Sequence, residues 1–116
     1  MTVYAIAQLR ITDRAAYGRY QAQFMDVLRQ YHGRLLVSDD SPVVVEGEWS
    51  YRKVVVLGFA DAAAFTRFAQ SPEYERISVD RKAGSVSVVL LVHGVGGVLS
   101  TSEPVLPAEQ QVEADG

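Results

Sequence analysis

Apolar side chains alternate with polar ones at the start of the chain, and from residue 14 they recur every three or four positions. The alternation predicts a strand over residues 3–11, with one apolar face made of Val3, Ala5, Ala7, Leu9 and Ile11. Asp13 is the predicted N-cap of the helix that follows. The apolar stripe of this helix comprises Tyr17, Tyr20, Phe24, Val27, Leu28 and Tyr31. Gly33 stands where a left-handed residue is expected to end it.

The next segment, residues 34–49, predicts two short strand pieces joined by a turn at residues 39–42. Such a turn would place Arg34 opposite Glu46, and a cross-strand ion pair is the structural interpretation of both residues. Residues 53–59 form a continuous apolar run, which is typical of a strand covered on both faces.

The second half of the chain predicts two helical pieces and a last strand. Asp61 is expected to cap a short helix over residues 62–70, and Ser71 and Pro72 end it and start a further helical turn. On that turn, Tyr74, Ile77 and Arg81 are spaced to share one side. The last strand is predicted over residues 85–95.

The order of elements predicts an α+β fold of βαββαβ type, with an antiparallel sheet and both helices on one of its faces. The strands predicted at residues 53–59 and 86–92 are nevertheless apolar on both sides. A second copy of the chain is the simplest cover for the face that the helices leave open, so a homodimer is expected.

The residues after position 96 differ in character from the rest. They are rich in proline, glutamate, glutamine and alanine, without a clear periodicity. We therefore expect one folded domain over residues 1–96 and a tail over residues 97–116, which is either mobile or docked on a partner subunit.

Length and composition narrow the function classes. A chain of 116 residues suits one domain with one core, so a roomy ligand site is expected at a subunit interface. The net charge of −3 argues against nucleic-acid binding, and the absence of cysteine excludes disulfides and thiolate chemistry. The first ten residues have neither the basic nor the long apolar region typical of a signal peptide, and no apolar run reaches membrane-spanning length, so we expect a cytoplasmic protein without membrane contact.

Several stretches resemble the DUF1330 family of uncharacterised proteins: YAIAQLRITDRAAYGRY, HGRLLV, VEGEW, VVVLGFADAAAFTRFAQSPEYERI and VLLVHGV. The resemblance covers residues 3–95 and is most specific at Ser71–Tyr74, followed by an arginine. It implies a ferredoxin-like fold that pairs into a dimeric α+β barrel. It implies no activity, because the family has none assigned. The family pattern has an acidic residue where this chain has His93.

Candidate chemistry is sparse. His93 is a candidate general base if it faces the open side of the sheet, and Arg81 a candidate clamp for a carboxylate or enolate. Tyr74, Trp49 and Arg34 are candidate ligand-binding residues. We expect Tyr74 and Arg81 beside the open face, close to His93. These candidates have structural alternatives. His93 would be a histidine with satisfied hydrogen bonds at the sheet edge, and Trp49 would pack at the dimer interface. Arg81 would form an ion pair with Glu73, Glu75 or Asp80.

Two functions agree with these residues. The favoured one is a homodimeric module that binds a small molecule or serves as an interaction domain, because no specific catalytic motif is present. The alternative is a cofactor-independent isomerase, lyase or monooxygenase that acts on a small apolar or aromatic substrate. The two histidines lack metal-ligand spacing, so neither a metal nor a cofactor is expected.

Overall fold

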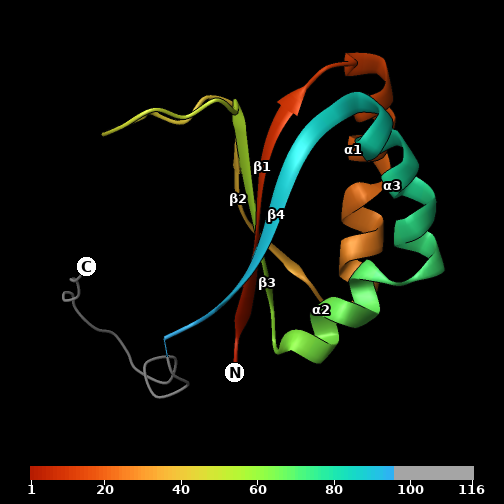
Figure 1. Cartoon of the computed structure of the whole chain (residues 1–116). Coiled ribbons are helices and arrows are strands. Elements are labelled where there is room, and N and C mark those ends of the chain that lie inside the picture. Colours follow the sequence, from red (N-terminus) through yellow and green to blue (C-terminus); the bar gives the residue numbers. More distant parts are fainter. Residues whose placement is uncertain (96–116) are drawn as a thin grey trace.

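The structure, a computed structural model, describes residues 1–95; the tail predicted over residues 97–116 lies outside the described residues. Along the chain the elements are β1 (Val3–Ile11), α1 (Arg14–Gln30), β2 (Arg34–Asp39), β3 (Lys53–Phe59), α2 (Ala62–Ala69), α3 (Pro72–Gly84) and β4 (Ser85–His93). The four strands form one sheet in the order β2-β3-β1-β4, and all neighbours are antiparallel. All three helices cover the same face of the sheet (Figure 1). This confirms the ferredoxin-like fold.

Side-chain caps start each helix where the sequence predicts it. Asp13 Oδ1 accepts hydrogen bonds from the amides of Ala15 and Ala16 at 3.0 and 3.2 Å, and Asp61 caps α2 in the same way. Ser71 Oγ accepts from the Tyr74 amide at 3.0 Å, which begins α3 directly after α2. In place of the short helical turn that the sequence predicts, α3 is a full helix of 13 residues. Its length was missed because its many polar residues conceal the amphipathic period.

The end of α1 differs from the prediction. His32, with φ of 62°, takes the left-handed position, and Gly33 does not. The Gly33 amide reaches the carbonyl oxygen of Leu28 at 3.0 Å, as in a Schellman cap with His32 at C′. Gly33 is needed for another reason: a Cβ there would lie 2.4 Å from a Leu28 methyl carbon and 2.7 Å from the Phe59 ring.

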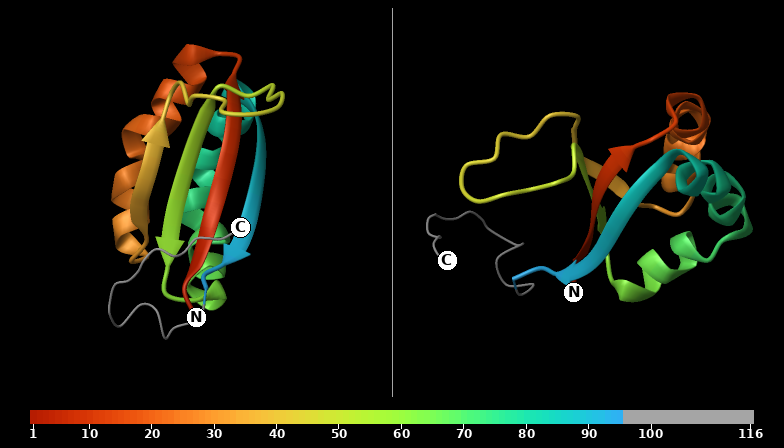
Figure 2. Two further views of the ribbon diagram at one scale, coloured as in Figure 1. Left: turned by 90° about the vertical axis from the view of Figure 1, so that its left-hand side faces the viewer. Right: turned by 45° about the horizontal axis from the view of Figure 1, so that its top comes forward.

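The strand predicted after the turn at residues 39–42 is wrong. Residues 40–52 form a loop that extends from the sheet on the side away from the helices (Figure 2). Arg34 pairs with Gly58 on β3, so the expected cross-strand pair with Glu46 is also wrong. The apolar run at residues 43–45 resembles a strand in sequence, but it pairs with no strand, although the outer edge of β2 has no strand beside it in residues 1–95. Val43 and Val45 are 84 and 92% exposed.

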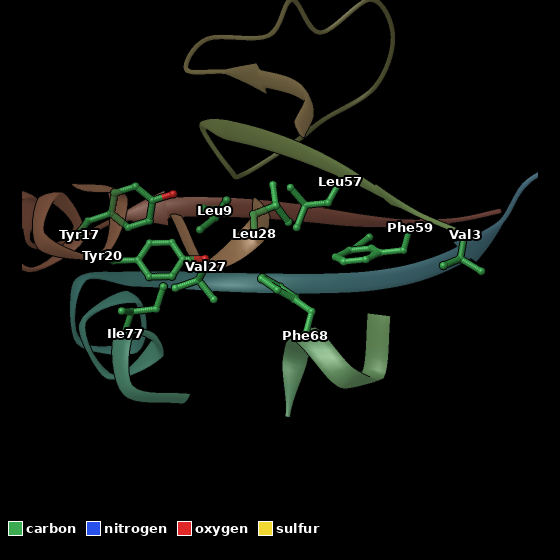
Figure 3. Packing of buried hydrophobic residues seen from close by; sticks show 11 residues of the cluster. Val3, Leu9, Tyr17, Tyr20, Val27, Leu28, Leu57, Phe59, Phe68 and Ile77 are labelled. Carbon is green, nitrogen blue, oxygen red and sulfur yellow. The ribbon is translucent and has the colours of Figure 1, made fainter. Parts of the chain in front are cut away.

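The register separates the sheet into two faces. Val3, Ala5, Ala7 and Leu9 lie opposite Phe59, Leu57, Val55 and Lys53, and this face meets the helices. The core fills the space between these layers, with Leu28 and Phe68 from the helices packed against Leu57 and Phe59 (Figure 3). Tyr4, Ile6 and Gln8 point to the other face, which no helix covers.

Candidate functional site

A cavity of about 550 Å³ lies between the helix-facing side of the sheet and the three helices. Ala5, Ala7 and Leu9 of β1 form part of its floor, and side chains of α1, α2 and α3 form its walls. The expectation that a chain of this size needs a subunit interface to build a roomy site is therefore wrong. The small side chains of Ala5 and Ala7, at the centre of the sheet, leave space that larger residues would fill.

Three cationic side chains line the cavity, Lys53, Arg81 and Lys82, and the first two lie at one end of it. Lys53 on β3 and Ser87 on β4 lie on either side of Leu9, in the same row across the sheet. Arg81, from the last turn of α3, donates from Nη1 to Ser87 Oγ at 2.6 Å. Lys53 and Arg81 both line the cavity. Because Lys53 and Ser87 are two strands apart, their backbones are separated by roughly 10 Å.

Arg81 lacks the carboxylate partner that the structural alternative required. Asp80 pairs with Arg19 at 3.0 Å, and Glu73 accepts a hydrogen bond from the Tyr31 hydroxyl at 2.6 Å. Within residues 1–95, no carboxylate oxygen lies within 4.0 Å of the Arg81 guanidinium. Its Nε is buried and has no hydrogen-bond partner there. A guanidinium in this situation has donor capacity left for a ligand.

Lys53 is 3% exposed, and a carboxylate in the loop that follows β2 binds its ammonium group. Its Nζ donates to Asp40 Oδ1 at 2.5 Å and lies 3.5 Å from Ser38 Oγ. The hydrogen bond and charge of Lys53 lower the pKa of Asp40 below its usual value. An ammonium has three donors, so this pairing leaves Lys53 able to meet a further acceptor.

Three tyrosines line the wall between the two ends. The hydroxyls of Tyr20 and Tyr74 are 3.0 Å apart, and the rings of Tyr17 and Tyr20 pack in a tilted arrangement with centroids 5.5 Å apart. Burial raises the pKa of Tyr17 to about 12, and burial together with the neighbouring Tyr74 raises that of Tyr20 further. Tyr17 and Tyr20 are therefore neutral phenols at physiological pH, able to donate or accept a hydrogen bond.

The opposite end of the cavity is apolar. Phe24 from α1 and Phe65 and Phe68 from α2 line it, with Leu57 of β3. Because β3 runs from Lys53 to Leu57 over four residues, the two ends are separated by roughly 13 Å. The cavity is thus elongated, with cations and phenols at one end and aromatic rings at the other.

The predicted site residues do not form one group. Tyr74 and Arg81 line the cavity, but on the helix-covered side of the sheet, so their expected position beside the open face is wrong. His93 lies opposite Val3 at the far end of β4; it is exposed and does not line the cavity. Strand parity points residue 93 to the helix side, so His93 does not face the open side as the general-base hypothesis required, and it lies beyond the end of the cavity.

Trp49 and Arg34 belong to the open face. Trp49 Nε1 donates to Gln8 Oε1 at 2.7 Å, which ties the loop of residues 40–52 to the open side of β1. Arg34 is exposed on β2 beside Gly58, and Gly58 shares the open face with Tyr4. Neither residue is part of the cavity wall.

Lys53 was missed as a site residue, although the sequence held a signal. It begins an apolar strand, and the period of two places it on the same face as Val55 and Leu57. A lysine on the covered face of a strand needs a partner.

The comparison with protein-family models covers most of the chain. The model of a domain of unknown function, DUF1330, matches residues 2–95. The chain belongs to the DUF1330 family.

Solved structures support the fold of this DUF1330 protein. A protein of unknown function from Rhodopseudomonas palustris is similar, with a TM-score of 0.71 and 15% identity over 82% of this chain and 83% of that one. SnoaB, a cofactor-independent oxygenase from Streptomyces nogalater, has a TM-score of 0.60 and 15% identity over 84% of this chain and 96% of its own.

A dimeric ferredoxin-like protein of unknown function from Jannaschia sp. CCS1 has a TM-score of 0.61 and 18% identity, over 81% of this chain and 100% of that one. None of the curated proteins searched matches the chain. At these identities the likeness concerns the fold and not the activity. In the part of the chain that the structure describes, no helix has the length and apolarity to cross a membrane.

Proposed function

We propose that this DUF1330 protein is a homodimer that binds a small, largely apolar or aromatic molecule in the cavity between its sheet and helices. The observation that carries this proposal is the cavity of about 550 Å³, with aromatic rings at one end and a few polar groups at the other. Ligand sites commonly combine such a volume with mostly apolar walls and a small number of polar side chains.

The proposal favours binding over catalysis. Within residues 1–95 the cavity wall contains no histidine, and its single carboxylate, Glu75, is exposed. Burial raises the pKa values of Tyr17 and Tyr20, which keeps these two side chains as neutral phenols. The wall thus supplies cations and hydrogen-bond donors, but no group suited to act as a general base near neutral pH.

The homodimer is the second part of the proposal. Apolar side chains of β2 and β4 are exposed on the open face, among them Leu36, Val88 and Leu90. A second copy would cover them by packing sheet against sheet, and related folds include dimeric proteins. The cytoplasmic location indicated by the sequence stays a prediction.

The binding test uses a pair of naphthalene probes of the same shape, 2-naphthoate and 2-naphthamide, titrated calorimetrically. Native mass spectrometry of the freshly purified protein examines copurified small molecules in parallel. Ala7→Phe places a ring in the floor of the cavity and should weaken binding of any probe at least tenfold. Ala69→Met fills the same space from α2 and serves if the first variant folds poorly.

Ala63→Phe is the matched control, because Ala63 lies on the exposed side of α2 and does not line the cavity. It should bind the probes as the wild type does. If neither probe binds and no small molecule copurifies, or if Ala7→Phe and Ala69→Met both leave binding unchanged, the proposed function is wrong.

A further inference from the structure

The cationic end of the cavity indicates what kind of molecule the site accepts. Arg81 and Lys53 reach this end from two different elements, α3 and β3, and both contribute to the cavity wall. Their side chains meet the cavity beside Leu9, in the row that joins Lys53, Leu9 and Ser87 across the sheet. Two cations that converge on one end of a largely apolar cavity, with Lys82 also in its wall, form an electrostatic site for an anion.

Resting on the proposed function, we infer that the ligand is an aromatic or alicyclic molecule with one anionic oxygen group, a carboxylate or enolate, bound by Arg81 with Lys53 nearby. The Arg81 guanidinium meets one protein acceptor, Ser87 Oγ, within the described residues, and its buried Nε has none there. Nε is closed to solvent, so an oxyanion in the cavity would accept from the terminal nitrogens of the guanidinium through charge-assisted hydrogen bonds.

The charge balance supports an anion rather than a neutral group. The three ion pairs of residues 1–95 join Arg19 to Asp80, Arg29 to Asp26 and Lys53 to Asp40, so none of them involves Arg81. Asp40 neutralises Lys53 from outside the cavity, because its own side chain is 83% exposed while that of Lys53 is 4% exposed. Within residues 1–95 no carboxylate forms an ion pair with Arg81, and the single carboxylate of the cavity wall, Glu75, is exposed to solvent, so a ligand anion would balance the charge of Arg81.

The remaining wall determines the shape of the ligand. From the cationic end the cavity passes the hydroxyls of Tyr20 and Tyr74, 3.0 Å apart, and ends among the rings of Phe24, Phe65 and Phe68. A molecule that reaches from Arg81 to these rings spans roughly 10–13 Å, as judged from the rise along β3. An anionic group on a one- or two-ring apolar body fits this distribution of charge and aromatic surface.

The decisive experiment compares 2-naphthoate with 2-naphthamide, which have the same shape and differ in charge. On the wild-type protein the anion should bind at least tenfold more tightly than the amide, the ratio expected for a hydrogen bond to a charged group. Arg81→Met retains the apolar length of the side chain and removes the charge. This variant should lose most of the preference for the anion, and the affinity for the amide should be unchanged.

Arg76→Met is the matched control, since Arg76 is an exposed arginine on the same helix and does not line the cavity. It should preserve the preference for the anion. Lys53→Met should reduce the preference, by less than Arg81→Met does, because Asp40 already takes one of the lysine's donors.

The outcomes separate this inference from the proposed function. If both probes bind the wild type equally and Ala7→Phe weakens both, the cavity binds ligands but the anion inference is wrong. If Arg81→Met retains the preference for 2-naphthoate, the anion site lies elsewhere and the inference is also wrong. Circular dichroism and sedimentation show whether each variant keeps the fold and the oligomeric state, and Arg81→Lys provides a second variant that retains the charge. Arg81→Lys should retain part of the preference.

Discussion

Leu90→Asp tests whether the open face of the sheet joins two copies of the chain. Leu90 lies on β4 opposite Ile6 of the central strand β1. On this face, five residues of β2 and β4 are between 39 and 46% exposed: Leu36, Val37, Val86, Val88 and Leu90. Full burial of a side chain of this type contributes about 1.5–3 kcal/mol, so burying the remaining two-fifths contributes about 0.6–1.2 kcal/mol.

For five residues in each of two copies, the gross gain is about 6–12 kcal/mol, of the same order as the cost of association, about 4–15 kcal/mol. The dimer thus has little free energy in reserve. An aspartate at position 90 would place one carboxylate per copy in a dry interface, at several kcal/mol each. Leu90→Asp should therefore be monomeric at micromolar concentration, with a folded subunit, because position 90 points away from the helices.

Sedimentation velocity measures the result directly, since one subunit has a mass of 12.7 kDa. Val79→Asp is the control: Val79 is 65% exposed on α3, on the opposite side of the molecule, and this variant should have the mass of the wild-type dimer. A dimeric Leu90→Asp protein, a monomeric Val79→Asp protein or a wild-type monomer would each refute sheet-to-sheet association.

The other predictions concern stability. Gly33→Ala should destabilise the protein by about 1–3 kcal/mol in urea denaturation, because the new methyl group overlaps Leu28 and Phe59. His32→Gly should stabilise it by roughly 1 kcal/mol, since glycine relieves the left-handed backbone; the opposite sign for either variant would contradict the assigned cap. Ser71→Ala should cost about 0.5–2 kcal/mol through loss of the α3 cap, and an unchanged urea midpoint would count against that role. The pKa of Tyr17 is higher in the folded protein, so its contribution to stability is complete below pH 10.0 and is lost as the pH rises towards about 12. Tyr17→Phe should flatten this alkaline decline in stability. An equally steep decline in the variant would show that Tyr17 does not cause it.

The fold was predictable because it depends on local patterns. Alternation over residues 3–11 and the apolar run of residues 53–59 located two central strands, and Asp13 and Asp61 located two helix starts. The strand predicted near residue 45 failed because β propensity alone does not determine whether a segment pairs: residues 43–45 leave the outer edge of β2 unpaired in the part of the chain that the structure describes. Which neighbour occupies an edge is a property of the assembled sheet.

The candidate site was only partly predictable. The spacing of Tyr74, Ile77 and Arg81 correctly placed them along one side of a helix, but not which face of the sheet that side would meet. The cavity depends on the distance between the sheet and the helices and on the two alanines of β1, Ala5 and Ala7. The pattern of apolar positions indicates that Ala5 and Ala7 are covered, but it does not indicate how much space remains between the sheet and the helices.

The two faces of the sheet divide the functions proposed here. Even-numbered residues of β1, such as Ile6 and Gln8, face the proposed dimer contact, whereas Ala5 and Ala7 face the ligand cavity. The loop of residues 40–52 touches both: Asp40 holds Lys53 at the cavity, and Trp49 binds Gln8 on the open face. Because one loop carries both contacts, a ligand anion that draws Lys53 away from Asp40 would also loosen the start of a loop that lies beside the dimer contact. Reciprocity of linked equilibria then requires that dimer formation and ligand binding influence each other wherever that loop differs between the free and bound states.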